Sequence, residues 1–157
     1  GTEGAKSKLP DREYVVPIGK GRIALEANQG KIDNHESMVV ITYGMGIYWA
    51  KTASKNFDGK VEILDLRSVS PWDEELVYER VRLHGKCLIV TEEPTGCNFA
   101  KSIAGSIQEN CFEKLDAPVK VIGSEDLPAI PLNSILEETM IPNAEKVENA
   151  LRELLEY

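Results

Sequence analysis

Short polar clusters that directly follow apolar runs are the residues best placed to do chemistry in this sequence. They are Gly44-Met45-Gly46, Asp65-Leu66-Arg67, Glu92-Glu93 and Ser124-Glu125-Asp126. Ligands of open α/β sheets bind beyond the carboxyl ends of the parallel strands, so these clusters mark the edge where a site would lie. That edge is strongly acidic, which disfavours a phosphate ligand unless Arg67 and a helix N-terminus dominate locally.

Gly44 and Gly46 stand where a dinucleotide-binding fingerprint would begin. They follow a strand-like run, open a helical segment and precede the acidic Asp65 by about 20 residues. The fingerprint requires a third glycine at position 49, where helix and strand approach closely, but this position is Trp49. A tight strand-to-helix turn is therefore the favoured interpretation, and a nucleotide- or effector-binding module is the alternative.

The charged residues of the other clusters have two interpretations each. Asp65 and Arg67 lie on one face of a strand end, where the guanidinium group would orient a substrate carboxylate or, more commonly, anchor a neighbouring loop or subunit. Glu92 and Glu93 are adjacent and point to opposite faces of a strand, so they do not form a pair for acid–base catalysis. We interpret both as cap and loop contacts.

The histidines do not belong to a recognisable catalytic or metal-binding pattern. His35 lies in a polar segment, and His84 precedes Gly85 at a predicted helix end, where a cation suits the helix dipole. The sequence has no Gly-x-Ser-x-Gly elbow, Walker loop or metal-spaced histidines. We therefore expect no catalytic, cofactor-binding or metal-binding residue in this chain.

Strands that alternate with helices must position these clusters. Runs rich in β-branched residues, typical of strands covered on both faces, occur at 38–43, 61–66, 87–90 and 119–122. Helices are predicted over 46–56, 70–85, 99–111 and 147–155. The second begins most clearly, with Ser70 as N-cap, Pro71 in the first turn and a carboxylate at Asp73. This alternation implies right-handed crossovers, a mostly parallel sheet and a three-layer α/β/α architecture.

The front of the chain differs from the rest. Residues 22–27 alternate between polar and apolar, which predicts a half-buried edge strand, and residues 28–37 are polar and rich in turn residues. Residues 1–13 lack apolar periodicity and are predicted to be a linker or tether. Residues 14–157 then form one domain.

The bulk composition is that of one globular domain of 157 residues, with 42% hydrophobic and 28% charged residues. No apolar run approaches the ~20 residues of a membrane helix, and the start does not resemble a signal peptide, so we expect a cytoplasmic protein. The net charge of −8 disfavours nucleic acid as a partner. Cys87, Cys97 and Cys111 are interpreted as buried thiols in a reducing compartment.

Longer motifs run through the chain. They are 16–21 (VPIGKG), 39–46 (VVITYGMG), 59–68 (GKVEILDLRS) with Pro71 and Asp73, 90–93 (VTEE) and 115–119 (LDAPV). Together they resemble the C-terminal domain of the transketolase superfamily, most closely the β-subunit type of the pyruvate and branched-chain 2-oxoacid dehydrogenases. The resemblance covers roughly residues 12–157; Gly21 departs from the alanine usual in the family.

The resemblance implies a specific fold and activity. The family fold is a five-stranded mixed sheet of order 1-3-2-4-5 with strand 1 antiparallel, which agrees with an edge strand followed by four core strands. Members decarboxylate a 2-oxoacid on thiamine diphosphate and pass the acyl group to a lipoyl arm. Their cofactor and magnesium lie between two upstream domains, and this chain has no Gly-Asp-Gly…Asn-Asn magnesium motif. We therefore expect this domain to be inactive by itself and to serve subunit assembly, oligomer contacts and docking.

Docking in the family involves the peripheral subunit-binding domain of the dihydrolipoyl acyltransferase. The positions that match the family's docking groups are Asp116 and the carboxylate of Tyr157. A basic partner that meets an acidic face fits electrostatic steering. The alternative is that Asp116 only caps a turn before Pro118.

A transferase remains an alternative to the dehydrogenase. The equivalent domain of transketolase or deoxyxylulose-phosphate synthase has the same implied fold. The Glu92-Glu93 pair and the motif at 115–119 favour the dehydrogenase.

Overall fold

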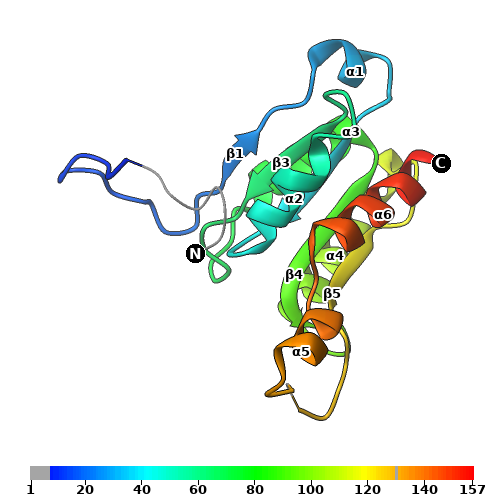
Figure 1. Cartoon of the computed structure of the whole chain (residues 1–157). Helices are drawn as coiled ribbons and strands as arrows, with labels where there is room; N and C mark the ends of the chain where they lie inside the picture. The colour runs from blue at the N-terminus through cyan, green and yellow to red at the C-terminus, as the bar shows by residue number, and fades with distance from the viewer. Residues whose placement is uncertain (1–7, 130) are drawn as a thin grey trace.

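The computed structural model of the chain describes residues 8–129 and 131–157. A single five-stranded sheet has the order β1-β3-β2-β4-β5, as predicted (Figure 1). The strands are β1 (Arg22–Leu25), β2 (Met38–Thr42), β3 (Val61–Asp65), β4 (Cys87–Pro94) and β5 (Lys120–Ser124). β1 pairs antiparallel with β3, and the other neighbours pair in parallel. The mixed, mostly parallel sheet is therefore confirmed.

Helices cover both faces of the sheet and complete the three layers. The helices are α1 (Gln29–Asp33), α2 (Gly46–Ser54), α3 (Glu74–His84), α4 (Phe99–Cys111), α5 (Ser134–Met140) and α6 (Ala144–Leu155), with a 3-10 turn at Phe112–Lys114. α2 and α6 share one core cluster with the sheet, and α3 and α4 share the other.

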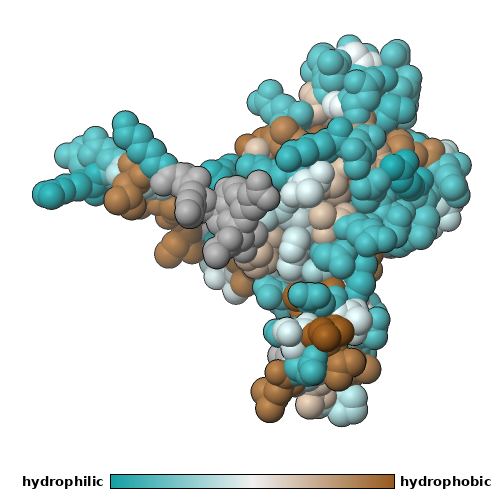
Figure 2. Space-filling model, viewed as in Figure 1, coloured by the Kyte–Doolittle hydropathy of each residue, from teal (hydrophilic) through white to brown (hydrophobic). Residues whose placement is uncertain are grey.

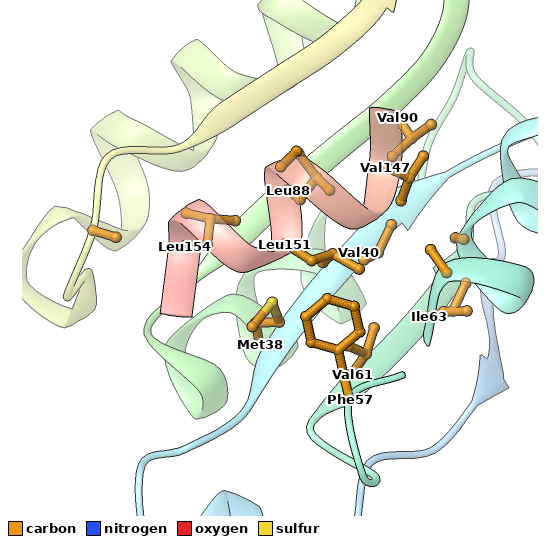
Figure 3. Packing of buried hydrophobic residues seen from close by; sticks show 14 residues of the cluster. Met38, Val40, Phe57, Val61, Ile63, Leu88, Val90, Val147, Leu151 and Leu154 are labelled. Atoms are coloured by element: carbon orange, nitrogen blue, oxygen red, sulfur yellow. The ribbon is translucent and has the colours of Figure 1, made fainter. Parts of the chain in front are cut away.

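The two core clusters follow from the alternation of side chains along each strand. Met38 and Val40 of β2 face α2 and α6, whereas Val39 and Ile41 face α3 and α4, and all four are fully buried. Figure 3 shows the first cluster, in which Val147, Leu151 and Leu154 of α6 lie against β2 and β4. A strand that is apolar on both faces needs helices on both sides, which explains the layered architecture.

The structure differs from the sequence prediction at three helices. The N-cap of α3 is Asp73, whose side chain accepts a hydrogen bond from the amide of Leu76, so Ser70 and Pro71 precede the helix. α1 lies within the predicted loop at 28–37, and α5 was not predicted. Both are short and bury only one side chain each, Ile32 and Met140, so they show no apolar stripe.

Two segments expose apolar side chains. Residues 8–18, here called the front arm, form no helix or strand, and Leu9, Val15 and Ile18 are largely exposed. Around α5, Leu132 and Ile135 are largely exposed, and Leu127 and Leu136 are about half exposed. Figure 2 shows brown apolar surface on the arm and again on the lobe formed by α5. Such patches mark surfaces for further contacts.

Residues 1–7 of the predicted linker lie outside the described residues, and a domain boundary near residue 13 stays a prediction. Among residues 8–129 and 131–157, no helix combines the length and apolar character that crossing a bilayer requires.

Candidate functional site

The turn at Gly44 and Gly46 is tightly packed. Gly44 has a positive φ of 59°, which favours glycine. A Cβ at Gly46 would lie 2.0 Å from Oγ1 of Thr42 and 3.2 Å from Cγ1 of Val90. The Thr42 hydroxyl is buried and donates to the carbonyl of Val90 at 2.9 Å, so it fills the space that a side chain would need. Glycine is required here because α2 begins in contact with β2 and β4.

Asp65 and Arg67 hold segments of their own chain. Asp65 accepts one hydrogen bond from Nε of Arg22 on β1 and another from the amide of Arg67, both at 3.0 Å. The Arg67 guanidinium donates to the hydroxyl of Tyr14 in the front arm at 3.2 Å. These contacts anchor neighbouring segments of the same chain. They leave Asp65 buried, with only 4% of its surface exposed.

The segment after the front arm is tied to the loop before α3. The amide of Gly19 donates to Oγ of Ser68 at 2.7 Å, and the amide of Gly21 donates to Oδ2 of Asp73 at 3.1 Å. Nζ of Lys20 lies 3.5 Å from Oδ1 of Asp73. Asp73 therefore caps α3 and anchors Lys20 and Gly21 at the same time, while Ser68 holds Gly19.

Glu92 and Glu93 have different surroundings. One Glu93 oxygen accepts from the Tyr43 hydroxyl and the other from the amide of Phe99 at the start of α4, both at 3.1 Å. Burial raises the pKa of the Tyr43 hydroxyl, and the neighbouring Glu93 raises it further. The Glu92 side chain is exposed, and only its carbonyl is engaged, by Oγ of Ser124 at 2.7 Å. The cap contact expected of this pair is made by Glu93.

A buried ionic cluster at the opposite edge of the sheet was not predicted. Glu62 of β3 accepts a hydrogen bond from Nε of Arg80 at 2.6 Å and lies 3.3 Å from Nε2 of His84. Nδ1 of His84 lies 2.7 Å from Oγ of Ser37. Burial alone would raise the pKa of Glu62, but the neighbouring His84 and the hydrogen-bonded Arg80 outweigh burial and lower it. A glutamate inside a fully buried strand was the sequence signal that such partners exist.

His84 is the last residue of α3, so its expected place at a helix end is confirmed. Its side chain is fully buried and serves as a link between α3, β3 and the residue before β2.

The prediction of buried thiols is correct for Cys87 and Cys111, whose pKa values are raised by burial, and wrong for the exposed Cys97.

The described residues contain no metal-binding cluster. Within residues 8–129 and 131–157, no group of three or more histidine, cysteine, aspartate or glutamate side chains is placed to hold a metal ion. The strand-end carboxylates are instead occupied by loop contacts, as described for Asp65 and Glu93.

Asp116 and Tyr157 meet at one surface pocket. The pocket has a volume of about 410 Å³ and is lined by Gln108, Phe112, Leu115, Asp116, Ala117, Pro118 and Tyr157. We call it the Asp116 pocket. Phe112 and Tyr157 are each 68% exposed, so the pocket presents two aromatic rings beside a carboxylate. Phe112 was not predicted, because it stands just beyond the apolar stripe of α4.

The Asp116 carboxylate has no partner of its own in the part of the chain that the structure describes. No hydrogen bond or ion pair there engages it, although the Asp116 amide donates to the carbonyl of Gly85 at 2.8 Å. On the other side of Tyr157 a second pocket of about 240 Å³ is lined by Pro118, Lys120 and Glu153, among others, and the last two form an ion pair. Tyr157 lines both pockets.

These observations define the class of protein. It is an α/β/α domain with a mixed five-stranded sheet whose strand-end polar groups hold its own loops. One of its surface pockets is lined by the carboxylate residue Asp116 and by the aromatic residues Phe112 and Tyr157.

The comparisons then identify the family. Residues 29–147 match the family model described as the C-terminal domain of transketolase. The chain therefore belongs to the transketolase C-terminal domain family.

Its curated relatives include β-subunits of dehydrogenases. The chain is 36% identical over 155 residues to the 2-oxoisovalerate dehydrogenase subunit beta of Bacillus subtilis, covering 97% of the chain and 45% of that protein. It is 32% identical over 148 residues to the pyruvate dehydrogenase E1 component subunit beta of Rhizobium meliloti, covering 92% of the chain and 30% of that protein. The chain thus spans less than half the length of these relatives.

A solved structure shares the fold. The chain matches one described as "Split gene transketolase, inactive beta4 tetramer" with a TM-score of 0.72 and 20% identity, over 96% of this chain and 46% of that one. At this identity the match supports the fold alone.

Proposed function

We propose that this chain is the C-terminal domain of a thiamine-diphosphate-dependent 2-oxoacid dehydrogenase of the β-subunit type. The whole enzyme oxidatively decarboxylates a 2-oxoacid and transfers the acyl group to a lipoyl group. This domain serves subunit assembly and docking to the acyltransferase core, with no catalysis of its own. Family membership and the names of the relatives support the class of enzyme.

The observation that carries the docking role is the Asp116 pocket. Asp116, whose carboxylate has no partner among the described residues, lines this pocket together with the exposed side chains of Phe112 and Tyr157. Aromatic rings supply apolar contact area, and a free carboxylate attracts a lysine or arginine side chain. This combination fits the basic peripheral subunit-binding domain of a dihydrolipoyl acyltransferase.

Assembly with other domains and subunits is proposed for the two exposed apolar surfaces. The front arm and the α5 segment hold most of the large exposed apolar side chains, which is typical of surfaces that are covered in an assembly. The proposed compartment is the cytoplasm, or the mitochondrial matrix in a eukaryote.

The docking role is tested by a charge reversal at the pocket. Asp116→Lys should weaken capture of the isolated subunit-binding domain at least fivefold in surface plasmon resonance, the effect of about 1 kcal/mol. Glu26→Lys, an equal charge change at an exposed position just after β1, at the opposite edge of the sheet from β5, is the matched control and should change the affinity much less. Equal effects of the two substitutions would remove Asp116 from the interface.

Calorimetry tests the proposal that this domain does not bind the cofactor by itself. Thiamine diphosphate with magnesium should give no saturable heat with this chain, because the proposed cofactor site lies on other domains of the enzyme. Binding of micromolar affinity would contradict the proposal.

A further inference from the structure

We propose that Gly85 is a positioning residue for docking: its missing side chain makes the space in which the Asp116 carboxylate sits. This inference rests on the docking role of Asp116 proposed above. It extends that role to a residue that lies outside the pocket lining and 31 positions earlier in the sequence.

The contact between the two residues is unusually close. A Cβ built on Gly85 would lie 2.1 Å from Oδ2 and 2.9 Å from Cγ of Asp116. Any residue other than glycine would therefore push the carboxylate out of its place. The backbone adds a second constraint, since the Asp116 amide donates to the Gly85 carbonyl at 2.8 Å.

The same contact places the carboxylate at the negative end of a helix. Gly85 is the left-handed C-cap of α3, with a φ of 70°, and its amide donates to the carbonyl of Val81. A carboxylate at a helix C-terminus is disfavoured by the helix dipole, and no ion pair among the described residues engages the Asp116 side chain; its amide donates to the Gly85 carbonyl. The free domain thus holds a charge that a cationic partner group would satisfy, which fits a lysine or arginine on the partner.

The buried ionic cluster holds this helix end in position. His84 directly precedes Gly85, and its two ring nitrogens lie 2.7 Å from Oγ of Ser37 and 3.3 Å from Oε1 of Glu62. Both partners belong to the sheet side of α3. Contacts with the core therefore fix the last turn of α3. Gly85 directly follows this turn and contacts Asp116, so the position of the turn also determines where Asp116 lies.

The test compares alanine substitutions at three glycines. Gly85→Ala should weaken capture of the subunit-binding domain about fivefold, the change expected for one partly exposed ion pair. Gly44→Ala imposes the same left-handed strain, with a φ of 59° and no atom within 4 Å of the new Cβ, and should leave capture unchanged. Gly105→Ala, in open space within α4, controls for the substitution itself.

A double-mutant cycle separates positioning from general destabilisation. In an Asp116→Asn background, Gly85→Ala should have little further effect on capture, because there is no carboxylate left to position. A merely structural role would instead reduce affinity by the same factor in both backgrounds and would overturn the inference. Gly85→Asn, which tolerates the left-handed backbone better but keeps a Cβ, should weaken capture like alanine if the alanine variant folds poorly.

The outcomes also distinguish this inference from the docking proposal. If Asp116→Asn weakens capture and Gly85→Ala behaves like Gly44→Ala, positioning by Gly85 is wrong and docking through Asp116 stands. If Asp116→Asn leaves capture unchanged, both are wrong.

Discussion

Removal of the buried Glu62 carboxylate should strongly destabilise the domain. Glu62 is 1% exposed and holds the positive charge of Arg80, whose side chain is 19% exposed, together with the ring of His84. Glu62→Leu leaves Arg80 without its acceptor and removes the carboxylate beside Nε2 of His84. Breaking a buried pair from one side costs about 3–5 kcal/mol, and the partial solvent access of Arg80 places the expected loss near the lower end, about 3 kcal/mol.

The assay is thermal and urea unfolding followed by circular dichroism. For a domain of this size, a loss of ~3 kcal/mol lowers the melting temperature by roughly 6–12 °C. The matched control is Glu79→Leu, because Glu79 pairs with the same Arg80 at 3.5 Å but is 69% exposed at its side chain. A surface pair of this kind contributes less than about 1 kcal/mol.

A compensated variant tests the cause of the loss. Replacing Glu62, Arg80 and His84 together by apolar residues of similar size should recover most of the stability, since no charge is then left buried without a partner. If Glu62→Leu costs no more than Glu79→Leu, or if the triple variant is the least stable, the reasoning about this cluster is refuted.

The stability should also depend on pH in a defined window. The pKa of Glu62 in the folded chain lies below its ordinary value of 4.5, so above pH 4.5 its contribution is fully present. The contribution is lost as the pH falls through the lower pKa of the folded state, where the folded chain also binds the proton. The stability difference between the wild-type chain and Glu62→Leu should therefore narrow as the pH falls below 4.5. A constant difference would show that Glu62 acts through packing alone.

Two further substitutions test the anchor and the turn at the carboxyl edge of the sheet. Asp73→Ala should lower the free energy of unfolding by about 1–2 kcal/mol, because it removes the N-cap of α3, and should speed hydrogen exchange at the amide of Gly21. Alanine at the exposed Glu75, in the first turn of α3, provides the control. Unchanged exchange at Gly21 would contradict the anchoring role of Asp73. Gly46→Ala should cost about 1–3 kcal/mol because its Cβ meets Thr42. Gly105→Ala should be neutral or stabilising by up to about 1 kcal/mol in the same unfolding assay, and equal costs at both glycines would disprove the packing argument.

The parts of the candidate site that could be predicted are those that depend on residues close together in the sequence. The interpretation of Gly44–Gly46 as a turn came from Trp49, which stands where a dinucleotide site needs glycine, and the structure shows the close packing of Gly46 against Thr42. Asp116 was found only through the motif at 115–119. The proximity of Gly85 to Asp116 could not be predicted, since it depends on where the end of α3 meets the segment before β5.

The sequence by itself determined the class of the fold. Runs apolar on both faces, such as 38–42, become strands only between two layers of helices, and their alternation with amphipathic segments requires parallel crossovers. These are local properties, since each residue's side chain is assigned to a face by the period of its own strand or helix.

Only the tertiary structure decided which polar groups meet. Glu62, Arg80 and His84 are separated by up to 22 positions, and Ser37 lies further still, yet they form one buried cluster. Asp73, and not Ser70, is the N-cap of α3, and it also binds the distant Gly21. Phe112 and Tyr157 come to line one pocket with Asp116 only after α4 and α6 pack on opposite faces of the sheet. The physical reason is that hydrogen bonds and ion pairs act over a few ångströms in space, whereas sequence periodicity specifies faces and not neighbours.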